Sequence, residues 1–128
     1  MEIYLREKDK QTLSAIFSTI DLPIEVWAYG SRIDGTAHEG SDLDLVIRTK
    51  NLSSLPLNVF ADICEQIKDS NIPILVELRD WAMLPENFLR NIEKNHEVLF
   101  DFRNSPEPSV RKQLVNEQPG PYKKKKLG

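Results

Sequence analysis

Two aspartates, two positions apart on an apolar stretch, are the residues of this chain best placed to do chemistry. Asp42 and Asp44 alternate with Leu43 and Leu45 in a segment rich in strand formers. Side chains two positions apart on a strand point to the same face, so the two carboxylates are expected side by side. Like charges placed this way repel each other. A divalent cation between them would supply the missing positive charge, and carboxylate oxygens suit Mg²⁺.

A Gly-Ser turn ends eleven residues before this pair. Gly30 lets the backbone turn tightly and approach a ligand closely. Ser31 offers a hydroxyl, and the backbone N–H groups around it can point at phosphate oxygens. Arg32 adds a positive charge for the same anion. A phosphate-binding turn beside a metal-binding pair is what phosphoryl or nucleotidyl transfer requires.

Glu77 is the candidate for a third acid. It lies in the otherwise apolar segment Ile74–Leu78. In a metal site it would hold the catalytic metal and accept the proton of an attacking hydroxyl. Alternatively, it is an edge-strand carboxylate that faces water, and only the upstream motif favours the catalytic interpretation.

The elements that must position these residues follow from hydrophobic periodicity and from Pro and Gly breaks. We expect helices over 5–20, 56–70 and 85–95, strands over 25–29, 42–49, 74–78 and 96–102, and a loop over 32–40 with room for one helical turn. This order predicts an α/β (α+β) fold in which a small mixed β-sheet has helices packed on one face.

Composition divides the chain into a domain over 1–102 and a flexible tail over 103–128. The tail holds four prolines and four consecutive lysines and has a net charge of 7 − 2 = +5, whereas residues 1–102 carry 10 − 18 = −8. An acidic domain is poorly suited to nucleic acid, whose binding depends on Lys and Arg. Lys123–Lys126 could make weak contact with RNA or an acidic partner, but a solvated tail is the favoured interpretation.

The remaining composition is that of a cytoplasmic protein. No apolar run approaches the roughly 20 residues of a membrane span, and the N-terminus lacks a signal-peptide pattern. The single cysteine, Cys64, suits a reducing compartment and is interpreted as a small core residue. Two histidines and one cysteine show no zinc-ligand spacing.

The motif Gly30-Ser31-Arg32, Gly35 and then Ser41-Asp42-Leu43-Asp44-Leu45 resembles the signature of the DNA polymerase beta-like nucleotidyltransferases. The small size, the loop Arg-x-x-Gly-x-Ala and the segment Val76–Trp81 are similar to the minimal nucleotidyltransferase (MNT) group. The resemblance covers about residues 11–100. It implies Mg²⁺ in a two-metal site and ATP as substrate. It further implies Asp42, Asp44 and Glu77 as catalytic metal ligands, and Gly30, Ser31, Arg32 and Ser41 as nucleotide-binding residues. Glu77 departs from the family, which usually has Asp there.

The resemblance also implies a biological setting. MNT proteins are typically antitoxins paired with a HEPN-domain ribonuclease, and some transfer AMP from ATP to a tyrosine of that toxin. The leading hypothesis is therefore a protein adenylyltransferase that acts as the antitoxin of a HEPN partner in a hetero-oligomer. A non-catalytic antitoxin that acts by binding alone is the alternative. Transfer to a small molecule such as an aminoglycoside ranks last, because the chain leaves no room for an additional helical domain.

Several other residues are weighed against plainer roles. His38 is interpreted as a polar loop residue, His96 as the start of a strand, and Trp27 and Tyr29 as core. Trp81 is equally compatible with core packing and with an interface. Asp80 is expected to cap the turn ahead of Trp81.

Overall fold

The structure, a computed structural model, describes residues 3–35 and 41–104. His38, the end of the predicted loop, and nearly all of the predicted tail with Lys123–Lys126 lie outside these residues. In chain order the elements are α1 (Glu7–Phe17), β1 (Ile24–Tyr29), α2 (Ser31–Asp34), β2 (Leu43–Thr49), α3 (Leu57–Lys68), β3 (Val76–Asp80), the 3₁₀ turn η1 (Trp81–Met83), α4 (Glu86–Lys94), β4 (Glu97–Asp101) and the 3₁₀ turn η2 (Phe102–Asn104).

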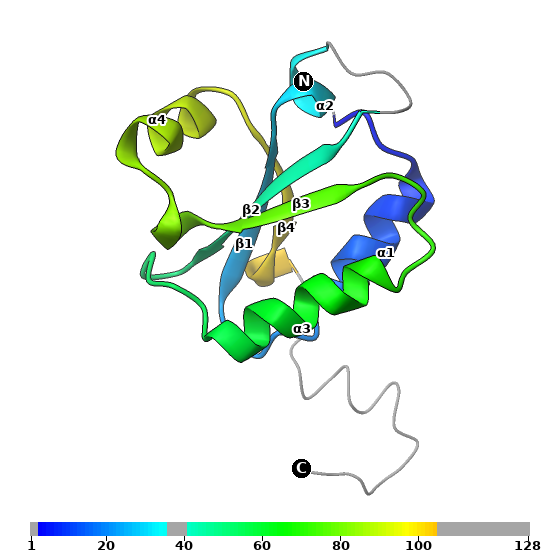
Figure 1. Cartoon of the computed structure of the whole chain (residues 1–128), viewed down its shortest axis with the longest axis horizontal. Helices are drawn as coiled ribbons and strands as arrows, with labels where there is room; N and C mark the ends of the chain where they lie inside the picture. Colours follow the sequence, from blue (N-terminus) through cyan, green and yellow to red (C-terminus); the bar gives the residue numbers. More distant parts are fainter. Residues whose placement is uncertain (1–2, 36–40, 105–128) are drawn as a thin grey trace, which may run out of the picture.

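The strands form one mixed sheet in the order β3-β2-β1-β4 (Figure 1). β1 lies at the centre and pairs antiparallel with both β2 and β4, whereas β2 and β3 run parallel. The predicted mixed sheet with helices is therefore confirmed, and so is the helical turn in the predicted loop, which is α2. The parallel pair needs a crossover connection, and α3 provides it.

Helices α1 and α3 cover one face of the sheet (Figure 1). The alternation of side chains along β1 and β2 sends Val26, Ala28, Leu43, Leu45 and Ile47 into this layer, where all are at most 1% exposed. The helices contribute a further apolar set, namely Leu13, Ile16, Phe17, Ile63 and Ile67. Because Leu43 and Leu45 are anchored here, their neighbours on β2 must face the other side of the sheet.

The opposite face is covered in part by α4 and η1, so the expectation that the helices pack on one face is wrong for α4. A second apolar cluster forms there from Trp27, Tyr29, Val46, Trp81 and Ile92. Trp27 and Tyr29 are thus core residues, as predicted, and the open question about Trp81 is resolved in favour of core packing, since it is 6% exposed. The rest of this face carries the Asp44 side chain of the Asp-Leu-Asp motif.

The third strand starts two residues later than the sequence predicts. Its predicted span was 74–78, whereas β3 spans Val76–Asp80 and pairs with Leu43–Ile47 of β2. The apolar run ends at Leu78, so it gives no reason to include Arg79 and Asp80 in the strand. An edge strand with one solvent-facing side nevertheless accommodates polar residues. Asp80 ends the strand and caps η1, as expected: its Oδ1 accepts from the Ala82 N–H at 3.0 Å.

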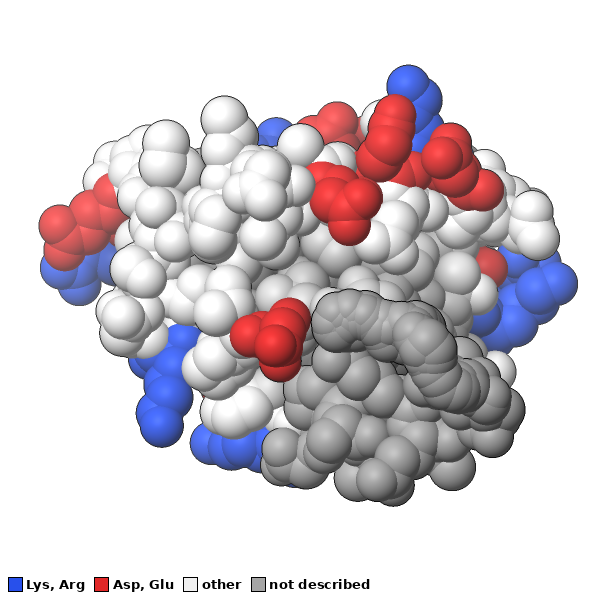
Figure 2. Space-filling model, turned by 90° about the horizontal axis from the view of Figure 1, so that it is seen from below, with Lys and Arg blue, Asp and Glu red and all other residues white. Residues whose placement is uncertain are grey.

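Figure 2 shows one face of the molecule, on which several acidic side chains gather at the upper right and the basic side chains lie around the rim without forming a continuous basic surface. Within residues 3–35 and 41–104, no helix has the length and apolarity that crossing a membrane would need.

Candidate active site

The register of the sheet places Tyr29, Asp44 and Glu77 side by side across three strands. We call the carboxylates of Asp44 and Glu77 the carboxylate row. Tyr29 of β1 pairs with Asp44 of β2, and Asp44 pairs with Glu77 of β3. Directly opposed residues on adjacent strands point to the same face. Asp44 and Glu77, which are 33 positions apart in the sequence, therefore lie side by side on the face opposite α1 and α3. The parallel pairing of β2 and β3 is what brings Glu77 to the aspartate motif.

Gly30 follows β1 and places the turn directly against the aspartate motif. Its backbone has φ 81° and ψ −152°, a region that residues other than glycine essentially do not occupy. A Cβ at this position would lie 2.8 Å from Oδ2 of Asp44. Both the backbone conformation and the close approach of the Asp44 carboxylate therefore require glycine. Ser31, the next residue, is the first residue of α2.

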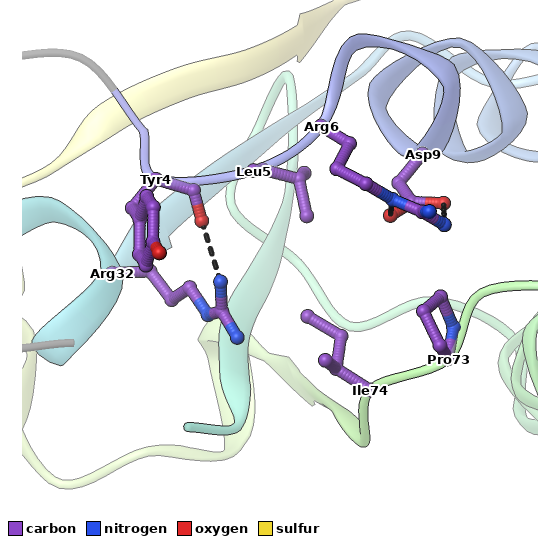
Figure 3. A pocket seen from close by; sticks show the side chains of 7 residues that line it. All are labelled: Tyr4, Leu5, Arg6, Asp9, Arg32, Pro73 and Ile74. Carbon is purple, nitrogen blue, oxygen red and sulfur yellow. Dashed lines mark hydrogen bonds and ion pairs between the residues drawn. The ribbon is translucent and has the colours of Figure 1, made fainter. Parts of the chain in front are cut away.

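Arg32 connects the N-terminal segment, α2 and the start of β2. The side chain is 5% exposed, and its guanidinium donates to the carbonyls of Tyr4 at 2.8 Å and Ser41 at 2.7 Å. The Tyr4 N–H in turn donates to the Arg32 carbonyl at 2.8 Å. Figure 3 shows the Arg32 side chain beside the Tyr4 ring, at the edge of a cavity of about 500 Å³. In this structure the Arg32 guanidinium therefore binds the backbone carbonyl of Ser41. From the sequence, a contact with a phosphate is expected instead.

The two motif aspartates differ in their surroundings. Asp42 is exposed just before β2, whereas the Asp44 side chain is 30% exposed. Burial raises the pKa of Asp44 above its usual value; the Arg79 guanidinium opposes this, and the charges of Glu77 and Asp42 raise the pKa further. The carboxylates of the motif therefore repel one another, as the sequence predicts.

Arg79 is the residue of this site that sequence reasoning missed. Its Nη2 lies 3.1 Å from Oε1 of Glu77, and its Nη1 lies 3.8 Å from Oδ1 of Asp44. Nη1 also donates to the Tyr29 hydroxyl at 3.2 Å. The signal in the sequence is the spacing: Arg79 stands two positions after Glu77 and shares its face on a strand that extends to Asp80, whereas the predicted strand ended at residue 78.

Tyr29 is held on both sides. Its ring meets Phe88 of α4 edge-on, with centroids 5.8 Å apart, and its hydroxyl faces Arg79. Burial raises the pKa of the Tyr29 phenol, partly offset by Arg79. The phenol therefore stays protonated near neutral pH and closes one side of the carboxylate row.

The donor chemistry of the row fits Mg²⁺. Asp44 on β2 and Asp42 just before it are hard oxygen donors, and Mg²⁺ is commonly bound by one or two carboxylates together with substrate phosphates. Within the described residues, no three His, Cys, Asp or Glu side chains are grouped closely enough to hold a metal ion. The Arg79 guanidinium lies between Asp44 and Glu77 instead. Glu77 accordingly stays a predicted ligand.

Beyond the row, the same face carries a stack of aromatic and cationic side chains. The Arg48 guanidinium lies 3.8 Å from the Trp27 ring centroid and 4.3 Å from that of Trp81. His96 stacks on Trp27 with centroids 3.7 Å apart. His96 precedes β4, as expected, and adds this packing role. The stack fixes η1 and the start of β4 against β1.

The fold and this arrangement define the class of protein. Residues 11–105 match the family model for "Polymerase beta, Nucleotidyltransferase". The chain therefore belongs to the polymerase beta nucleotidyltransferase family, as the motif predicts.

Two known proteins give the similarity more detail. A Haemophilus influenzae protein named "Probable protein adenylyltransferase MntA" is 32% identical over 100 residues, which cover 77% of this chain and 84% of that protein. A solved structure described as "Crystal structure of the toxin-antitoxin with AMP-PNP" superposes with a TM-score of 0.53 at 17% identity, over 86% of both chains. At that identity the second similarity supports the fold alone.

Proposed function

We propose that this chain is a Mg²⁺-dependent adenylyltransferase that transfers AMP from ATP to a tyrosine hydroxyl of a HEPN-family toxin and so acts as its antitoxin. The observation that carries the proposal is the row of Asp44 and Glu77 next to Gly30. The similarity to the adenylyltransferase MntA supports the reaction, and the toxin–antitoxin assembly with AMP-PNP is the precedent for nucleotide and partner.

Each residue has a defined task in this reaction. The Gly30-Ser31 turn would bind the triphosphate, and Asp42, Asp44 and Glu77 would hold Mg²⁺. The bound ion would neutralise charge that develops on the phosphate oxygens. The tyrosine oxygen would attack the α-phosphorus, its proton would pass to Glu77, and the bond to the β-phosphate oxygen would break to release pyrophosphate. Ser41, fixed by Arg32, would position the start of the aspartate strand beside the nucleotide.

The reaction is tested by incubating the chain with Mg²⁺, a HEPN protein encoded by a neighbouring gene, and ATP labelled on either the α- or the γ-phosphate. Label from the α-phosphate should enter the HEPN protein, and label from the γ-phosphate should not. The Asp42→Ala/Asp44→Ala protein should transfer at least about 100-fold less, since the metal ligands are gone. Asp62→Asn, on the exposed side of α3, is the matched control. Equal transfer by the double variant would refute the enzymatic role.

A second candidate function is favoured by Arg79. Its guanidinium lies between two of the predicted metal ligands, at 3.1 Å from Glu77 and 3.8 Å from Asp44. A chain in which an internal cation partly neutralises the predicted metal site could act as an antitoxin by binding its partner without catalysis. On this hypothesis, the Asp42→Ala/Asp44→Ala protein still protects cells from the toxin. Loss of protection while the complex still forms would exclude this second candidate.

A further inference from the structure

We propose that Arg79 is an internal cation of the carboxylate row, which holds the row together without metal and must be displaced before a divalent cation can bind there. The proposal concerns the metal-binding step. It rests on the proposed function in one respect, namely that the site binds a metal ion. It assigns to Arg79 a role as the residue that sets the affinity of this site for divalent cations.

The contacts of Arg79 place it where a bridging cation would lie. One guanidinium nitrogen is 3.1 Å from Oε1 of Glu77, and the other is 3.8 Å from Oδ1 of Asp44. These are carboxylate oxygens that a metal between β2 and β3 would need. A planar guanidinium that spans two carboxylates uses the geometry for which arginine is suited. Arg79 and a metal ion therefore compete for the same atoms.

The charge balance leads to the same conclusion. The carboxylates of Asp44 and Glu77 both lie against the Arg79 guanidinium, so that the group keeps a net charge of 1 − 2 = −1, and the charge of Asp42 nearby adds to it. This remaining charge attracts a divalent cation. A divalent cation bound next to Arg79 would be repelled by it, and the repulsion is strong at short range in a partly buried site.

Arg79 is able to leave. Its side chain is 37% exposed at the edge strand of the sheet, so the guanidinium can turn toward solvent without disturbing the core. Tyr29, its third partner, also packs edge-on against Phe88, a contact that does not involve Arg79. The site therefore has two arrangements: one with Arg79 between Asp44 and Glu77, and one with the metal ion in its place.

The test measures Mn²⁺ binding by electron paramagnetic resonance without nucleotide, so that it does not depend on AMP transfer. Arg79→Gln keeps hydrogen-bond donors near Tyr29 and Glu77 but removes the charge. We expect it to bind Mn²⁺ at least about tenfold more tightly than the unaltered chain. Arg79→Lys should stay close to the unaltered chain. Arg90→Gln, which breaks an exposed ion pair with Glu86 on α4, controls for the loss of one positive charge.

Stability gives an independent readout. In EDTA the thermal midpoint of Arg79→Gln should lie below that of the unaltered chain, since Asp44 and Glu77 then lie side by side without a cation. Added Mg²⁺ should raise the midpoint of Arg79→Gln more than that of the unaltered chain. A purely structural arginine would lower the midpoint equally with and without Mg²⁺.

Should Arg79→Gln fail to fold, the unaltered protein still decides the question. The arginine side-chain NMR signal of Arg79 should shift as Mg²⁺ or Mn²⁺ is titrated, whereas the signal of Arg90 should not. Metal binding that leaves the Arg79 signal unchanged, or no metal binding by either protein at millimolar concentration, would overturn the proposal. A failure of AMP transfer alone would refute the proposed function and leave this inference standing.

Discussion

At the scale of single residues, the carboxylates that would bind a metal ion repel one another and so lower the stability of the fold. Asp44 is partly buried, and Asp42 and Glu77 carry the same charge nearby. Arg79 offsets only part of this repulsion. The arrangement stores charge repulsion that a cation would relieve, which is the pattern expected of a binding site and not of a stabilising one.

The raised pKa of Asp44 predicts how its removal affects folding at different pH values. A carboxyl whose folded-state pKa is above its unfolded value binds protons more tightly in the folded state, so its contribution to stability falls as pH rises from the unfolded to the folded pKa. At pH 7 without metal, Asp44→Asn should therefore be more stable than the unaltered chain.

The measurement is urea unfolding in EDTA at pH 7 and below the ordinary carboxyl pKa, where the gain should vanish. Asp62→Asn, which removes an exposed carboxylate on α3, is the control for the loss of one negative charge. A loss of stability by Asp44→Asn at pH 7 would contradict the prediction.

Gly30 and Gly35 both have a positive φ, but only Gly30 lies against Asp44. Comparing variants at the two positions therefore separates the cost of backbone strain from the cost of the contact with Asp44. Gly35→Ala, at φ 87° and with no described atom within 4 Å of its Cβ, should lose about 1–2 kcal/mol of unfolding free energy. Gly30→Ala adds a 2.8 Å contact with the Asp44 carboxylate and a less accessible backbone region, so its loss should be larger, about 3 kcal/mol or more.

The unfolding free energies are obtained from denaturant titrations with equal m-values. Mn²⁺ affinity should also fall in Gly30→Ala, because Asp44 must move, and stay unchanged in Gly35→Ala. Equal losses of stability in both variants would show that the Asp44 contact carries no cost.

At the scale of elements, the site depends on connections as much as on strands. α2 is only four residues long, and Arg32 holds it to the N-terminal segment and to Ser41. The turn that follows β1 and the strand that carries the aspartates are thereby fixed relative to each other. Arg32 is thus a structural link between the two halves of the motif.

Replacing Arg32 should loosen this link. Arg32→Met removes the donors to the Tyr4 and Ser41 carbonyls, and the loss of unfolding free energy should be about 2–4 kcal/mol. Arg90→Met, on the exposed side of α4, should change stability by less than about 0.5 kcal/mol. Hydrogen exchange should show faster opening at Tyr4, whose N–H bonds to the Arg32 carbonyl. Unchanged exchange there would refute the linking role.

At the scale of the whole molecule, the fold is a four-stranded sheet with unequal faces. α1 and α3 bury one face completely enough to form the main core, whereas α4 covers only part of the other. The uncovered part carries the carboxylate row. A small domain can thus present an acidic site on a sheet while its stability comes mostly from the opposite side.

The domain boundary that the sequence predicts leads to an expectation for a shortened chain. A chain that ends at Asn104 keeps every described element, and Arg103 anchors the end through ion pairs with Asp101 and Glu25. Its thermal midpoint should therefore lie within about 2 °C of that of the full chain. A fall of several degrees would show that residues beyond 104 contribute to the fold. Calorimetry of both chains provides the comparison.

The sequence by itself determined the order of elements, because period-two alternation and Gly and Pro breaks are local signals, and its motif indicated the family by resemblance. It placed Asp42 and Asp44 on one face and Gly30 at a turn without any tertiary information. Which residue faces Asp44 across the sheet was decided only by the parallel register of β2 and β3, which sets Glu77 opposite it. The tertiary structure also assigned Arg79 to the space between the carboxylates and Arg32 to backbone carbonyls. Local patterns indicate to which face of its strand a side chain points. Packing and charge balance between segments that are distant in the sequence decide which residues it contacts.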